Sequence, residues 1–60
     1  MKFKIGDTVD AEGFTGKIID KGPDPVNQRI IKYKVDFGLG IGTAWYQEYQ
    51  LKKIEQRFKL

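Results

Sequence analysis

Turn-forming residues recur along this chain every 8 to 12 residues, and this spacing constrains the fold more than any other feature of the sequence. The turn signals are rich in glycine, aspartate and proline, and they lie at 6–7, 13, 22–25 and 38–42. Segments this short hold one strand each, and no helical periodicity runs through them. The spacing therefore predicts a small all-β sandwich or barrel.

The segments between the turns are enriched in β-branched and aromatic residues, which favour strands. The five predicted strands span 8–11, 15–21, 29–37, 41–47 and 51–54. The third is the clearest, because apolar and charged residues alternate along it with the period of a half-buried strand. Its inward set is Ile31, Tyr33, Val35 and Phe37. Its outward set is Lys32, Lys34 and Asp36.

Two connections stand out. Residues 22–28 contain two prolines, which cannot donate to a ladder, and they predict an exposed, mobile loop. Three glycines in 38–42 predict a tight hairpin with an apolar tip at Leu39 and Ile41. A phosphate-binding loop would need a following helix or a Lys-Ser/Thr pair, and 38–42 is followed by neither.

The chain is 60 residues long, which predicts a single domain over 1–60, with a core at about 3–54 and a tail at 55–60. It contains no cysteine and no histidine, so neither a disulfide nor a Cys/His zinc site can stabilise it. The absence of any long apolar stretch predicts a cytoplasmic protein with no membrane partner. A net charge of +3 mildly favours polyanionic partners.

Four segments, FKIGDTV, EGFTGKIID, YKVDF and AWYQEYQLKKI, resemble the SH3-like small-barrel superfamily, which includes KOW and Tudor-type modules. In that pattern Gly6-Asp7 opens the first strand, Gly16 stands at the entry to the second, and the segment 46–54 leads through a short 3₁₀ turn into the last. The resemblance covers residues 3–54 and implies a five-stranded SH3-like barrel. It implies no single function, because barrels of this type host unrelated activities.

The chain is also similar in outline to the plasmid-borne type II dihydrofolate reductases, which have a Val-Gln-Ile-Tyr strand near the end of the domain. Here the matching stretch is Thr43-Ala44-Trp45-Tyr46. The tyrosine agrees, but Ala44 replaces the glutamine that faces the pore in that family, and Trp45 replaces the isoleucine. These departures argue against a reductase.

Catalysis has little chemical basis in this sequence. Without histidine and cysteine, the commonest general base and two usual nucleophile or metal-ligand types are missing. The carboxylates are scattered among lysines, which predicts a solvated surface and, for Asp7, a turn. They are Asp7, Asp10, Glu12, Asp20, Asp24, Asp36, Glu48 and Glu55. We therefore predict a non-catalytic protein with no cofactor and no metal.

Eight aromatic residues exceed what so small a core requires. Strand parity predicts Tyr33, Phe37 and Trp45 in the core, with Tyr46 on the opposite face. An exposed patch of Phe14, Tyr46 and Tyr49 could stack on bases or hold a peptide. The other interpretation is that these rings close the ends of the barrel.

Basic residues predominate around the third strand. The candidate phosphate-binding set is Lys17, Lys21, Arg29, Lys32 and Lys34. Lysines on strands also discourage sheet-to-sheet aggregation, which needs no ligand. The sequence thus predicts a binding module with two partner classes open: DNA or RNA through the basic and aromatic face, or a protein or peptide, as for an accessory protein of a phage or plasmid. The oligomeric state is open as well.

Overall fold

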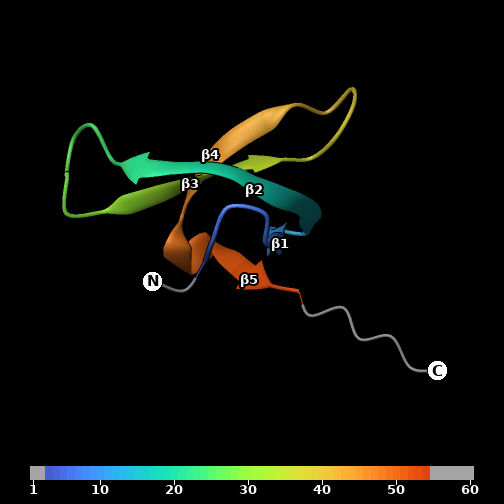
Figure 1. The fold of residues 1–60 in the computed structure, drawn as a ribbon, viewed down its shortest axis with the longest axis horizontal. Helices are drawn as coiled ribbons and strands as arrows, with labels where there is room; N and C mark the ends of the chain where they lie inside the picture. The colour runs from blue at the N-terminus through green and yellow to red at the C-terminus, as the bar shows by residue number, and fades with distance from the viewer. Residues whose placement is uncertain (1–2, 55–60) are drawn as a thin grey trace.

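Five antiparallel strands and one 3₁₀ turn make up residues 3–54, the part of the chain that the computed structural model describes (Figure 1). They are β1 (Thr8–Ala11), β2 (Phe14–Pro23), β3 (Ile31–Asp36), β4 (Thr43–Gln47), the turn η1 (Glu48–Gln50) and β5 (Leu51–Lys53). The predicted strands and the predicted 3₁₀ turn are confirmed, with shifts of a few residues at the ends. The predicted tail at 55–60 lies outside the described residues.

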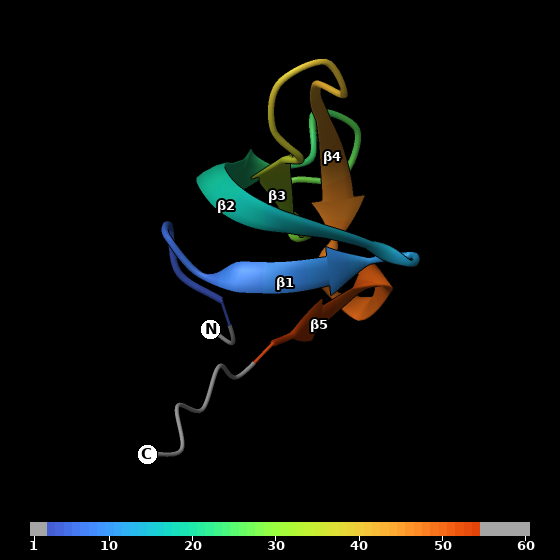
Figure 2. The same ribbon diagram turned by 90° about the vertical axis from the view of Figure 1, so that its right-hand side faces the viewer.

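The strands form one sheet in the order β4-β3-β2-β1-β5. Figure 2 shows β1 and β5 side by side below, with β2 crossing to β3 and β4 above. β4 and β5 are the two edges, and within residues 3–54 they do not pair with each other. The all-β class is therefore confirmed, whereas closure of the sheet into a barrel is not observed.

The β1–β2 connection shows how local sequence dictates this topology. Only Glu12 and Gly13 lie between the paired residues Ala11 and Phe14. Both have positive φ, 52° and 96°, as a two-residue turn compatible with the right-handed twist of a hairpin requires. Glycine accepts this geometry without a steric penalty. The short turn brings β2 directly against β1.

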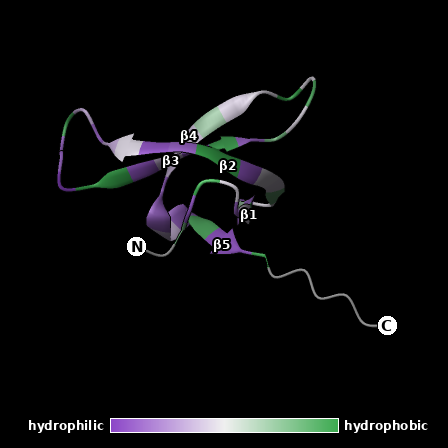
Figure 3. Ribbon diagram, viewed as in Figure 1, coloured by the Kyte–Doolittle hydropathy of each residue, from purple (hydrophilic) through white to green (hydrophobic). Residues whose placement is uncertain are grey.

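The core lies on one face of the sheet, and we call the opposite face the outer face. Its buried side chains come from the N-terminal segment and from four strands: Phe3, Val9, Ala11, Ile18, Tyr33, Val35 and Leu51. Partly buried Ile31, Phe37 and Tyr46 pack against them. The alternation predicted for β3 is confirmed, because its inward residues belong to this core. Figure 3 shows the resulting change between apolar and polar stretches along the strands.

β2 contains a bulge that the sequence did not predict. Ile18 lies opposite Val35, but Asp20, two residues later, lies opposite the next residue of β3, Lys34. Ile19 is therefore the extra residue, and the side-chain parity of β2 reverses after it. Without the bulge Lys21 would lie opposite Lys32. With it, Lys21 lies opposite Tyr33, on the other side of the sheet.

The prediction for Trp45 and Tyr46 was wrong. In the β3–β4 register Trp45 lies opposite Lys34, on the outer face, and Tyr46 lies opposite the buried Tyr33. Trp45 is consequently 47% exposed, with the Lys34 Nζ 6.0 Å from its ring centroid, while Tyr46 packs against the core. Neighbouring side chains of β4 do point to opposite faces, as predicted. Which of the two faces the core is set by the register between β4 and β3, which the sequence of β4 alone does not reveal.

Two predicted turns are present as expected. The Lys4 amide donates a hydrogen bond to the Asp7 carboxylate at 2.9 Å, so Asp7 is the turn residue that the sequence predicts. In the hairpin at 38–42 the Phe37 amide donates to the Gly42 carbonyl at 3.0 Å. The tip residue Leu39 is fully exposed, and Ile41 is exposed as well.

The connection between β2 and β3 differs from its prediction in two respects. β2 continues through Gly22 and Pro23, so the loop starts later than expected. Asp24, predicted to be solvated, is 8% exposed. Its carboxylate accepts a hydrogen bond from the Val26 amide at 2.8 Å and forms an ion pair with the Lys32 Nζ at 3.3 Å. The physical reason is that the carboxylate folds back over its own loop.

These contacts make Asp24 an acid-sensitive group. The Val26 amide, and after it Lys32, lower the pKa of Asp24 below its ordinary value of 3.8, against the opposing effect of burial. A carboxyl group whose pKa is lowered on folding stabilises the protein at pH values above its unfolded-state pKa. This stabilisation is lost as the pH falls through the folded-state pKa. We expect Asp24→Asn to lose less unfolding free energy at acidic pH than wild type, as measured by urea unfolding at a series of pH values. The control is Glu12→Gln, which replaces an exposed carboxylate in the β1–β2 turn and should lose as much as wild type. Identical pH profiles for wild type and Asp24→Asn would contradict the prediction.

Candidate functional site

The predicted basic stripe is interrupted by carboxylates. On the outer face of the sheet Lys17 lies opposite Asp36, and Lys34 lies opposite Asp20. Lys32 forms an ion pair with Asp24, as described above. The structure thus brings Lys17, Lys32 and Lys34 to one face, but each has an acidic neighbour. Such pairs weaken the field that a phosphate backbone would meet.

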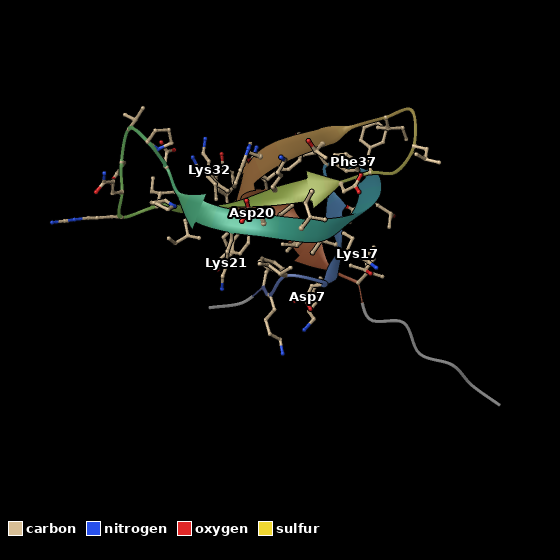
Figure 4. All side chains as sticks on the ribbon, turned by 45° about the horizontal axis from the view of Figure 1, so that its top comes forward. Asp7, Lys17, Asp20, Lys21, Lys32 and Phe37 are labelled. Carbon is tan, nitrogen blue, oxygen red and sulfur yellow. The ribbon has the colours of Figure 1, made fainter. Side chains whose placement is uncertain are left out.

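The other two predicted cations lie elsewhere. Figure 4 shows Lys21 and Lys32 on opposite sides of the ribbon, as the bulge in β2 requires. Arg29 lies in the loop before β3 and is exposed. The five predicted basic residues therefore do not form one continuous stripe.

The lysines of β5, like those of β3, each have an acidic neighbour. Lys52 lies opposite Asp10 of β1, and the Lys53 Nζ lies 3.8 Å from the Asp7 carboxylate. Residues 3–54 hold eight basic and seven acidic side chains. The described part of the chain is therefore close to neutral.

The predicted aromatic patch separates into two parts. Phe14 contacts Phe37 edge-to-face with ring centroids 6.2 Å apart, and Phe37 contacts Tyr46 in the same way at 6.0 Å. These three rings form one cluster at the end of the sheet near the 38–42 hairpin. Tyr49 lies on η1, away from that hairpin, and its side chain is 81% exposed.

Tyr49 borders a groove of about 940 Å³. We call this the η1 groove; Phe3, Arg29, Ile30, Ile31, Tyr33, Gln47, Glu48, Tyr49, Leu51, Lys52 and Lys53 line it. Buried Phe3, Tyr33 and Leu51 give the groove an apolar floor, and exposed charged residues on η1, β5 and the loop before β3 give it a polar rim. Phe3 and Tyr33 contact each other edge-to-face on that floor, with ring centroids 5.4 Å apart.

A hydrogen bond between a backbone amide and a side chain supports the rim of the η1 groove on the side of Tyr49. The Gln47 amide donates a hydrogen bond to the Gln50 side-chain oxygen at 2.9 Å, which holds the first turn of η1 against the end of β4. Because η1 is only three residues long, this contact fixes where the Tyr49 side chain leaves the backbone. The ring is thus presented at the rim by the fold itself.

Sequence reasoning identified Arg29 and Tyr49 but missed Phe3, Leu51 and the β5 lysines as members of one site. These residues come from the N-terminal segment, from the loop before β3 and from β5, which only the sheet order brings together. No local pattern could have revealed them.

The arrangement is suited to binding. Within residues 3–54 no three Asp or Glu side chains gather as a metal ion would require. No helix in the same range is long and apolar enough to cross a membrane. What the η1 groove offers is an apolar floor, an exposed aromatic ring and a rim with three cations, Arg29, Lys52 and Lys53, and one carboxylate, Glu48.

Comparisons with known proteins add no relative: no protein-family model, curated protein or solved structure matches this chain.

Proposed function

We propose that this chain is a non-catalytic binding module whose η1 groove holds an extended segment of a partner protein. The observation that carries the proposal is Tyr49, an 81% exposed ring above an apolar floor. Exposed aromatic rings beside apolar floors are typical anchors of peptide recognition, because they bury large area at little entropic cost. An SH3-like, non-enzymatic module of the cytoplasm is the class to which we assign it.

The strand order and the position of η1 support the SH3-like part of the proposal. A meander of β1 to β4 followed by a 3₁₀ turn and a fifth strand that returns to β1 is the arrangement implied by the sequence resemblance. The two edge strands are connected through η1, and residues of β4, η1 and β5 line the groove. We therefore propose the binding site beside η1, on the side where the sheet is open.

The distribution of charge supports a peptide rather than a nucleic acid as the proposed partner. A nucleic acid would need several unopposed cations, whereas the lysines on β3 and β5 have carboxylates across from them. Arg29 differs, because it lies in the exposed loop before β3, has no strand residue across from it, and lines the η1 groove. The groove therefore favours a peptide with apolar anchor residues and one acidic side chain placed for Arg29.

A selection from a displayed library of random peptides tests this proposal. We expect the selected peptides to combine an apolar residue with aspartate or glutamate, and Tyr49→Ala to weaken their binding at least about tenfold. Phe14→Ala is the matched control, since it removes an exposed ring from the other end of the sheet and should leave binding unchanged. The readout is fluorescence anisotropy of a labelled peptide.

Binding of oligonucleotides is the result that would contradict the peptide proposal. Single-stranded DNA and RNA are added to the same variants at low salt and at about 0.3 M, where screening is strong. Tight binding that falls steeply with salt and is lost in Lys17→Ala would replace the peptide proposal with a nucleic-acid interface on the outer face. Equal losses in Tyr49→Ala and Phe14→Ala would also count against the η1 groove.

A further inference from the structure

The two edges of the sheet differ in how they are protected. β5 has three residues, of which Lys52 and Lys53 are charged, and short charged edges resist pairing with another strand. β4 has five residues, Thr43–Gln47, with no charge and no proline, and its register with β3 is regular. β4 therefore lacks three of the usual protective features: a charge, a proline and a bulge.

The backbone of β4 shows which groups this edge offers. The Phe37 amide donates to the Gly42 carbonyl, so Gly42 faces β3. By the two-residue period of an antiparallel ladder, Ala44 and Tyr46 also face β3, whereas Thr43 and Trp45 turn their N–H and C=O groups away from the sheet. Gln47 also faces outward, but its amide already donates to the Gln50 side chain at 2.9 Å.

We propose that two copies of this chain associate through β4, antiparallel about a twofold axis at Trp45, so that one sheet continues across both. Trp45 and Trp45 of the partner subunit then exchange two backbone hydrogen bonds. The Thr43 amide donates to the carbonyl of Gln47 of the partner subunit, and the reciprocal bond forms by symmetry. The Gln47 amide, already bonded to Gln50, needs no partner at the end of this ladder.

Charge points to a second copy as the occupant of this edge. Twofold pairing places each residue of a strand opposite itself or its mirror position, so a charged strand would oppose like charges. β4 is uncharged and avoids this cost, whereas pairing of β5 with itself would bring lysines together. The small Ala44 lies opposite Tyr46 of the partner subunit and leaves room for that ring. This inference goes beyond the proposed function, because it uses the β4 edge rather than the η1 groove.

Sedimentation equilibrium over a concentration series tests the proposal. We expect wild type to shift from the 6.9 kDa monomer toward twice that mass as concentration rises. Trp45→Lys should raise the dimer dissociation constant at least tenfold, because it places two lysines opposite each other. If Trp45→Lys does not fold, Thr43→Lys serves in its place. Thr43 is also exposed, and its substitution should likewise raise the dimer dissociation constant. Ile19→Lys is the matched control, an exposed apolar residue on the inner strand β2, and should behave as wild type.

Amide hydrogen exchange adds a readout of the register. Protection should rise with concentration at Thr43 and Trp45, whose amides face outward, and stay constant at Ala44, whose amide already faces β3. A wild-type chain that remains monomeric at about 1 mM overturns the proposal. Equal weakening by Ile19→Lys and Trp45→Lys overturns it too, since the contact would then involve the outer face and not the edge.

Discussion

Gly16→Ala is expected to lower the free energy of unfolding by about 2–3 kcal/mol, because there is no space for one more carbon at this position. A Cβ on Gly16 would lie 2.4 Å from Val35 Cγ1, 2.9 Å from the Asp36 carbonyl oxygen and 3.0 Å from Phe37 Cδ1. The carbonyl belongs to the neighbouring strand, so relief would require β2 and β3 to separate. A domain of this size has roughly 3–9 kcal/mol of stability in total, so the variant should be partly unfolded.

Urea unfolding followed by circular dichroism measures this effect, with Gly22→Ala as the control. Gly22 lies in the same strand, and a Cβ there meets no atom within 4 Å. Its substitution should change stability by no more than about 0.5 kcal/mol. Equal urea midpoints for the two variants would show that the tight approach between Gly16 and β3 relaxes at no cost.

Much of the fold could be predicted from the sequence because local signals agree with one another. Alternation along β3 placed Tyr33 and Val35 in the core correctly, and glycines placed the turns at 13 and 38–42. The bulge at Ile19 could not be predicted, because a bulge depends on how two strands pair rather than on either strand alone. Its consequence, the separation of Lys21 from Lys32, was therefore missed.

The candidate site was harder to predict for two physical reasons. The alternation of side chains along β4 was correctly predicted, but the face assigned to each residue was not. Trp45 pairs with Lys34 and therefore lies on the outer face, whereas Tyr46 lies on the core side. The η1 groove is formed by residues far apart in the chain, from Phe3 to Lys53. Tyr49 was identified because the sequence places it in or near a loop, between the last two predicted strands. Its neighbours depend on the sheet order.

Tyr33→Ala is expected to lower the free energy of unfolding by about 3–5 kcal/mol, the usual cost of deleting a large buried ring. Tyr33 is 1% exposed and contacts Phe3 edge-to-face, so its loss leaves a cavity in the middle of the sheet and beneath the η1 groove. Urea unfolding should show little folded protein, and binding at the groove should disappear with the fold. A midpoint close to that of wild type would mean that the core refills the space.

Tyr33→Phe separates the ring from its hydroxyl. Burial, with Glu48 as a second cause, raises the pKa of Tyr33 above its ordinary value of 10.0. A tyrosine whose pKa is raised on folding stabilises the protein at pH values below its unfolded-state pKa. This stabilisation is lost as the pH rises through the folded-state pKa. Wild type should therefore lose stability above about pH 10, and Tyr33→Phe should lack this component while keeping most of its stability at neutral pH. If Tyr33→Phe unfolds as readily as Tyr33→Ala, the hydroxyl and not the ring stabilises the core. The groove floor would then rest on a polar contact, and a bound peptide would have to preserve it.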